Sequence, residues 1–144
     1  VTVTSDFHSN IENIWDKIQD VNTLREICKP KASFIACDDS PIQWKEGKTF
    51  VFKMYLHGFL PVGRHTINVV KMDKTSREID TKEYDNTVVI WNHYIKMKEI
   101  SQQVTRYTDT VDLYAGCLTS IAAWWTLKFY KHRQRKWQKI AKSL

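Results

Sequence analysis

The chain has 144 residues, of which 42% are hydrophobic and 26% are charged, and its formal net charge is +6. This length and composition suit one globular domain and exclude an intrinsically disordered chain. No apolar run approaches the roughly 20 residues that cross a bilayer, and no signal-peptide pattern opens the chain, so we expect a cytoplasmic protein. The three cysteines lack metal-type spacing and are expected to be reduced thiols: Cys28, Cys37 and Cys117.

The N-terminal segments predict one strand followed by two short helices. Residues 1–8 alternate valine with threonine or serine, as a half-buried strand does. Residues 9–20 begin with a predicted capping box, in which Ser9 is the N-cap and Glu12 lies three residues later. A second helix over residues 23–28 ends before a proline, which disfavours helical geometry in the residue that precedes it.

The middle of the chain predicts six strands joined by short turns. The strands cover residues 32–39, 49–57, 64–73, 77–84, 87–100 and 105–114. The sequence GFLPVG at residues 58–63 is expected to form a turn, and Asp85–Asn86 marks another reversal. Strands that follow each other through short turns favour an antiparallel sheet.

Residues 117–144 predict one long helix whose first half is apolar on nearly every side. At about 100° per residue, one apolar stripe contains Leu118, Ile121, Ala122, Trp125 and Phe129. We expect the sheet to pack against this stripe. An open, curved sheet around a single helix leaves room for an apolar pocket between them.

The second half of this helix carries the excess positive charge. Seven of the 22 basic side chains lie at residues 128–142, which leaves 15 basic and 16 acidic side chains in residues 1–127. We expect this basic end to project beyond the sheet and to be mainly solvated, with a weak contact to an anionic membrane as its only binding role. Nucleic-acid binding is not expected, because the remaining chain is slightly acidic and no glycine-rich phosphate loop is present.

The order and local patterns of these elements resemble the START/polyketide-cyclase superfamily (SRPBCC), and in particular its bacterial members of unassigned function. The similar pieces run from the first helix to the last: SNIENIWDKIQD, GFLPVGRHTI, WNHYI, TRYTDTVDLYAGCLT and FYKHRQRKW. The resemblance implies a single α+β helix-grip domain over residues 1–144, with a curved seven-stranded antiparallel sheet wrapped around a long C-terminal helix (β-α-α-β6-α). It also implies a cavity between sheet and helix for a lipid, sterol, polyketide-like or other hydrophobic molecule.

Two polar side chains fall among residues that are expected to face inward. If the last hairpin turns near Ser101, residues whose numbers sum to 202 face each other, which sets His93 opposite Asp109. A His–Asp pair can transfer protons in a polyketide cyclase or dehydratase. It can equally be a buried pair whose members satisfy each other's hydrogen bonds. Because no nucleophile motif is present, we assign no catalytic residue, and His93 and Asp109 are the only candidates.

The candidate ligand-binding residues are the inward-facing side chains around the expected cavity: Trp15, Phe52, Met54, Leu56, Ile67, Trp91, His93, Tyr107, Asp109, Trp125 and Phe129. His8, His57 and His65 lie near loops without a ligand-type spacing, so we expect surface histidines and no metal site. No cofactor is expected. The sequence therefore predicts binding of a hydrophobic small molecule, with a cyclase-type enzyme as the alternative and a basic-surface module for membrane or nucleic acid as a further one.

Overall fold

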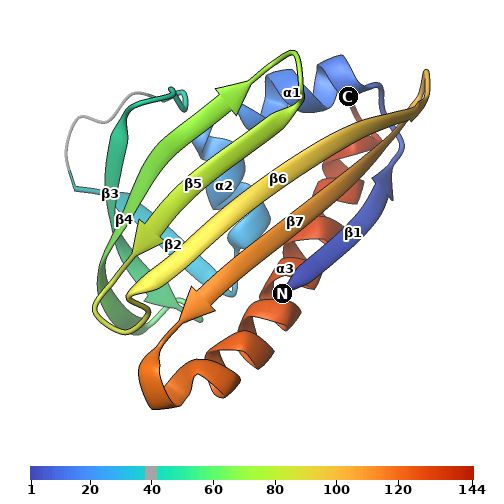
Figure 1. The fold of residues 1–144 in the computed structure, drawn as a ribbon. Coiled ribbons are helices and arrows are strands. Elements are labelled where there is room, and N and C mark those ends of the chain that lie inside the picture. The colour runs from blue at the N-terminus through green and yellow to red at the C-terminus, as the bar shows by residue number, and fades with distance from the viewer. Residues whose placement is uncertain (38–41) are drawn as a thin grey trace.

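The computed structural model describes residues 1–37 and 42–144. One seven-stranded antiparallel sheet carries all three α-helices on the same face (Figure 1). The elements are β1 (Thr2–Phe7), α1 (Ile11–Ile18), α2 (Val21–Cys28), β2 (Ala32–Ala36), β3 (Thr49–Leu56), β4 (Leu60–Asp73), β5 (Glu78–Tyr84), β6 (Ile90–Ser101), β7 (Val104–Tyr114), a 3-10 turn η1 (Gly116–Leu118) and α3 (Thr119–Ala141). The predicted α+β helix-grip class and the order β-α-α-β6-α are confirmed.

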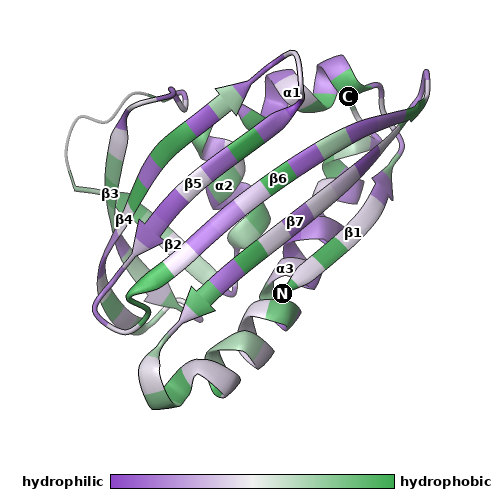
Figure 2. Ribbon diagram, in the orientation of Figure 1, coloured by the Kyte–Doolittle hydropathy of each residue, from purple (hydrophilic) through white to green (hydrophobic). Residues whose placement is uncertain are grey.

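The strands lie in the order β1-β7-β6-β5-β4-β3-β2, so the two N-terminal strands form opposite edges of the sheet. Hydrophobic and hydrophilic residues alternate along the strands (Figure 2), and the hydrophobic ones pack toward the helices. No helix within the described ranges is long and apolar enough to cross a bilayer.

The first helix begins one residue later than predicted. Its N-cap is Asn10, whose Oδ1 accepts a hydrogen bond from the Asn13 N–H at 2.8 Å. The predicted Ser9–Glu12 capping box is therefore wrong. The Ser9 carbonyl instead accepts a hydrogen bond from the Thr105 hydroxyl at 2.9 Å, and the Glu12 carboxylate pairs with Arg77.

Two predicted boundaries in the middle of the chain also change. The predicted strand over residues 32–39 ends at Ala36, and its last two residues lie outside the described ranges. The predicted turn at residues 58–63 is shorter, because β4 already begins at Leu60. His57 and Gly58 both have positive φ angles (52° and 81°), which lets the chain reverse there within a few residues.

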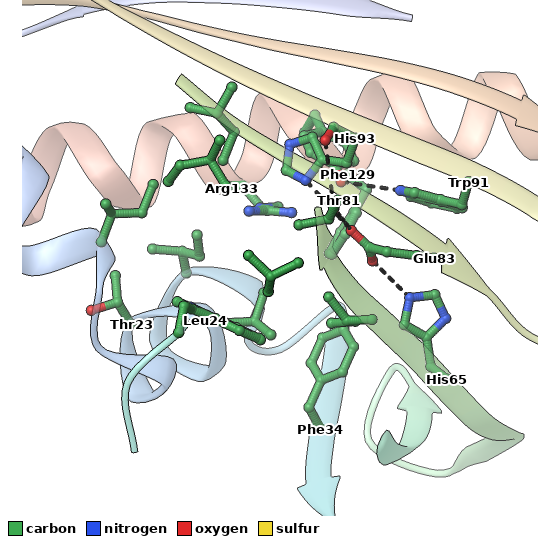
Figure 3. A pocket seen from close by; sticks show the side chains of 18 of the residues that line it. Thr23, Leu24, Phe34, His65, Thr81, Glu83, Trp91, His93, Phe129 and Arg133 are labelled. Carbon is green, nitrogen blue, oxygen red and sulfur yellow. Dashed lines mark hydrogen bonds and ion pairs between the residues drawn. The ribbon is translucent and has the colours of Figure 1, made fainter. Parts of the chain in front are cut away.

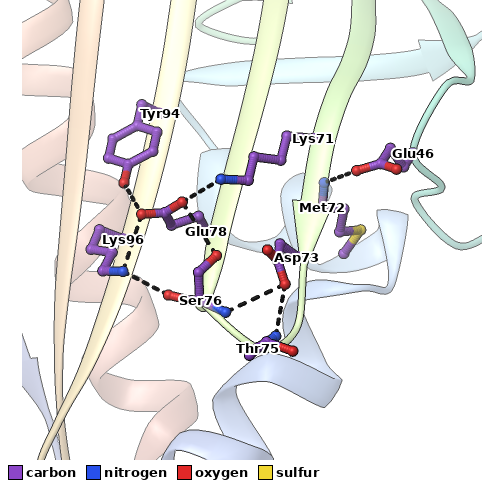
Figure 4. A network of polar contacts seen from close by, with 9 residues as sticks. All are labelled: Glu46, Lys71, Met72, Asp73, Thr75, Ser76, Glu78, Tyr94 and Lys96. Atoms are coloured by element: carbon purple, nitrogen blue, oxygen red, sulfur yellow. Dashed lines mark hydrogen bonds and ion pairs between the residues drawn. The ribbon is translucent and has the colours of Figure 1, made fainter.

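A polar network on the outer face of the sheet supports the β4–β5 hairpin (Figure 4). The Glu78 carboxylate accepts hydrogen bonds from Lys71, Tyr94 and Lys96, at 2.6, 2.7 and 3.1 Å. These donors lower the pKa of Glu78 to about 2. At the turn itself the Asp73 carboxylate accepts the backbone N–H of Thr75 at 2.8 Å.

The β6–β7 hairpin has a register that differs by two residues from the predicted one. His93 lies opposite Val111, and Ile95 lies opposite Asp109, because the turn is displaced and the pairing shifts near Ser101. The predicted facing of His93 and Asp109 is therefore wrong. An even shift leaves every side chain on its expected face of the sheet, however, and the His93 and Asp109 side chains still meet diagonally.

The C-terminal helix packs with the opposite half from the one predicted. Its first turns extend beyond the ends of β1 and β7 (Figure 1), where Ile121 and Trp124 are 66% and 59% exposed. The buried face lies further along the helix, and its members are Thr126, Phe129, Tyr130, Arg133, Gln134, Trp137 and Ala141. Of the predicted stripe, Phe129 is fully buried, and Ala122 and Trp125 are partly buried against the core. The prediction is wrong for Leu118 and Ile121, which are exposed.

Aromatic stacking and a glutamine hydrogen bond hold the basic half of α3 against the sheet. Trp137 is 1% exposed and stacks on Phe7 with ring centroids 5.7 Å apart, and Tyr107 lies 5.9 Å from the same indole. The Gln134 amide donates to the Val3 carbonyl at 2.8 Å. The basic end does not project beyond the sheet, because every third or fourth residue of this half packs inward.

This packing predicts unequal effects of two tryptophan substitutions in α3. Trp137→Ala should lower the free energy of unfolding by about 3–5 kcal/mol, because it removes a fully buried aromatic side chain. Trp124→Ala should change it by less than about 1 kcal/mol, because that side chain is exposed and contacts Lys128. Chemical denaturation measures both values. A larger loss for Trp124→Ala than for Trp137→Ala would contradict this packing of α3.

Candidate ligand-binding site

A cavity of about 90 Å³ lies between the inner face of the sheet and the helices α2 and α3 (Figure 3). Its wall is formed mainly by aliphatic and aromatic side chains: Ile18, Leu24, Ile27, Phe34, Trp44, Met54, Ile67, Val69, Ile79, Trp91, Ile95, Phe129, Tyr130 and Trp137. A smaller polar group completes it: Thr23, His65, Thr81, Glu83, Asp85, His93 and Arg133. An apolar wall with a few polar groups is the usual composition of a small-molecule site.

The structure brings five of the predicted ligand-binding residues to the cavity wall: Met54, Ile67, Trp91, His93 and Phe129. The other six lie elsewhere, and they are Trp15, Phe52, Leu56, Tyr107, Asp109 and Trp125. Tyr107 is covered by Phe7 and Trp137, and Asp109 lies behind His93. Trp125 stacks on Phe129 from outside the buried face of α3. Many side chains on the helix-facing side of the sheet therefore pack in the core without reaching the cavity.

A row of alternating acidic and histidine side chains crosses the inner face of the sheet. His65 on β4 donates to Asp85 at 3.1 Å and to Glu83 on β5 at 2.8 Å. Glu83 lies 3.7 Å from the next histidine, His93 on β6. His93 donates to Asp109 on β7 at 2.7 Å. This acid–histidine row, defined by these five residues, is almost wholly buried.

The carboxylates raise the pKa of both buried histidines. Burial alone would lower the pKa of His65, but the hydrogen bonds to Asp85 and Glu83 outweigh it and raise this pKa to about 9. Burial alone would raise the pKa of Glu83, but the contacts with His65 and His93 outweigh this effect and hold the pKa well below its usual range. The pKa of His93 is raised against burial by Asp109 and Glu83.

This arrangement leaves the row without a free proton acceptor. Both ring nitrogens of His65 and of His93 face carboxylate oxygens. The second oxygen of Asp109 accepts a hydrogen bond from Gln134 at 2.9 Å, and the Thr81 hydroxyl donates to Glu83 at 2.6 Å. Within the described residues no three such side chains converge on one point as metal ligands do. The row therefore fits mutual hydrogen bonding better than proton transfer to a substrate.

The sequence reasoning missed four functional candidates: His65, Glu83, Asp85 and Arg133. The expectation that His65 lies at the surface is wrong, since this residue is 4% exposed. The available signal was the alternation along the strand, because His65, Ile67 and Val69 are every second residue and therefore point to the same face of the sheet. Glu83 likewise falls in phase with Ile79. Arg133 lies one helical turn after Phe129 and so on the same face, but a basic residue in a basic segment reads as solvated.

No family model matches the chain, and no curated protein matches it. Solved structures do match over nearly its whole length. The protein Ms6760 of Mycobacterium smegmatis aligns with 15% identity and a TM-score of 0.73, covering 96% of this chain and 88% of its own. A START superfamily protein of the same organism has 11% identity and a TM-score of 0.69, with coverages of 99% and 97%.

The chain has the helix-grip fold of the START superfamily. The Zhui aromatase/cyclase from Streptomyces sp. R1128 also shares this fold, with 12% identity, a TM-score of 0.73, and coverages of 99% and 92%. At these identities the likeness extends to the fold alone, so the chemistry of this chain has to be argued from its own cavity.

The raised pKa of His65 predicts a pH dependence of stability. A pKa raised from 6.5 to about 9 stabilises the fold fully below pH 6.5, and this stabilisation is lost as the pH rises through 9. The loss amounts to roughly 3 kcal/mol. Denaturant unfolding between pH 6 and 9.5 should show a clear decrease, and in His65→Gln this decrease should be smaller.

His57→Gln is the matched control, because His57 is an exposed histidine of the neighbouring turn. It should retain the decrease of the unmodified chain. An identical pH profile for the unmodified chain and His65→Gln would mean that His65 is not the titrating group.

Proposed function

We propose that the protein binds a hydrophobic small molecule in the cavity between sheet, α2 and α3, without catalysing a reaction on it. The observation that carries this proposal is the apolar void itself, which the large aromatic side chains of the interior leave open. Side chains in most protein interiors pack without voids larger than a water molecule. A void of about 90 Å³ in the middle of a well-packed interior therefore supports a ligand site.

The volume favours a small ligand. An apolar cavity of ~150 Å³ is known to hold a benzene molecule, and sites for drug-sized ligands occupy roughly 300–1,000 Å³. A void of about 90 Å³ is smaller than the benzene-binding cavity, so it suits a short chain, and a single ring fits after a small outward shift of the wall. A sterol, a long lipid or a complete polyketide would require several wall side chains to move.

The cyclase alternative has less support from the site. The fold is shared with the Zhui aromatase/cyclase, but a fold hosts several activities. The histidine candidate, His93, is hydrogen-bonded to Asp109 through Nε2, and its Nδ1 faces Glu83 at 3.7 Å, so both ring nitrogens point at carboxylates and not at a substrate. Among the described residues, the cavity wall contains no serine or cysteine, and the hydroxyl of Thr81 already donates to Glu83.

The basic side of α3 offers a second, weaker contact surface. Its exposed cations are Lys128, Lys131, Arg135, Lys139 and Lys142. Weak attraction of residues 128–142 to an anionic membrane, without nucleic-acid binding, stays a prediction based on charge. Arg133 does not belong to this surface, because its side chain is buried.

The cavity predicts saturable binding of a small apolar probe. Toluene, titrated against 15N-labelled protein, should shift the indole N–H resonances of Trp91 and Trp137 with one-to-one stoichiometry, because both indoles line the cavity. Ile67→Trp should abolish this binding by filling the space. Ile121→Trp, a control at a 66% exposed position, should bind toluene normally. Failure of the unmodified chain to bind any small apolar probe would exclude the proposed function.

A further inference from the structure

Arg133 is the one charged side chain of the cavity wall that has no partner among the described residues. It projects from α3 into the cavity and is 6% exposed (Figure 3). Within residues 1–37 and 42–144, no carboxylate lies within ion-pair distance of its guanidinium and no acceptor takes a hydrogen bond from it. Its Nε is fully buried without a partner. Such an unsatisfied buried cation is costly for the fold.

The nearest groups do not meet the needs of this guanidinium. Its carbon lies 4.5 Å from the centre of the Tyr130 ring, a contact with the face of the ring that leaves the in-plane N–H donors free. The neighbouring carboxylates are already bound by other donors: Glu83 by His65 and Thr81, and Asp109 by His93 and Gln134.

Charge balance alone does not account for Arg133. The three carboxylates of the acid–histidine row outnumber its two histidines, so the row carries surplus negative charge, which a nearby cation offsets through space. The surplus is already dispersed, since Asp85 also accepts the backbone N–H groups of Thr87 and Val88 at 2.8 and 2.7 Å. Attraction through space between the Arg133 cation and the negative charge of the row provides no hydrogen-bond acceptor for the guanidinium N–H groups. These donors therefore remain available to a ligand.

We propose that Arg133 binds the carboxylate of a small amphipathic acid whose apolar part fills the cavity. This inference rests on the proposed function and names the ligand class: a short-chain or single-ring organic acid. The planar guanidinium fork matches the two oxygens of a carboxylate and forms paired, charge-assisted hydrogen bonds with them. The aromatic and aliphatic wall excludes water from this pair, which strengthens it.

The test compares an acid with its neutral isostere. Hexanoate and hexanamide have the same chain and nearly the same shape, and they differ in the charge of the head group. Calorimetric titrations should use the unmodified chain, Arg133→Met, Arg133→Lys and Arg135→Met. Arg135 is the matched control, because it lies two residues along the same helix with an exposed side chain.

The unmodified chain and Arg135→Met should bind hexanoate about ten- to a hundredfold more tightly than hexanamide. Arg133→Met should lose this preference and retain the affinity for hexanamide. Arg133→Lys should keep a reduced preference, because a lysine supplies charge without the planar fork. Equal affinities for acid and amide in the unmodified chain would overturn the inference and leave the proposed function standing, whereas binding of neither compound would count against the proposed function itself.

Stability gives a readout that is independent of the ligand. Without ligand, Arg133→Met should unfold at the same temperature as the unmodified chain or at a higher one, because the buried unpaired cation is removed. Addition of hexanoate should raise the unfolding temperature of the unmodified chain and of Arg135→Met, but not that of Arg133→Met. A lower unfolding temperature of Arg133→Met, together with an unchanged preference for the acid, would make Arg133 a structural residue.

Discussion

The interior of this protein depends on a row of buried charges that satisfy one another. The acid–histidine row draws one side chain from each of the neighbouring strands β4, β5, β6 and β7, and a further one, Asp85, from the loop after β5. Unpaired, each of these groups would destabilise the fold, because a buried charge loses its hydration. Because each group pairs with the next one across the sheet, the row constrains the mutual positions of four strands. A one-residue slip of any strand would turn one member to the outer face and leave its neighbours without a hydrogen-bond partner.

The row also determines where the long helix can pack. Gln134 reaches from α3 to the last carboxylate of the row and to the backbone of the edge strand β1. Those two contacts, with the Trp137 stack, place the basic half of α3 over β1 and β7 and leave its apolar first turns beyond the sheet. The remaining space between α2, α3 and the central strands is the cavity, and Arg133 enters it from the same buried helix face. The cavity and the position of Arg133 in its wall are thus consequences of how the helix is anchored.

Alternation along the strands was sufficient to predict the fold and the inward faces. It placed His93 and Asp109 on the interior and survived a register error of two residues, because an even shift preserves the face. Periodicity failed for α3. Its first half is apolar on most sides and so presents no unique stripe, while the face that packs contains Arg133 and Gln134, which read as solvent-exposed residues. Their burial depends on partners far away in the sequence, and local patterns carry no information about these.

The account requires the two central histidines to be imidazolium ions, since each has both ring nitrogens directed at carboxylates. Nitrogen-15 chemical shifts of the imidazole rings report this directly. At pH 7 both ring nitrogens of His65 and of His93 should be protonated. A neutral ring for His65 or His93 at pH 7 would contradict the account, because a deprotonated nitrogen would then face a carboxylate oxygen and be free to accept a proton from a ligand.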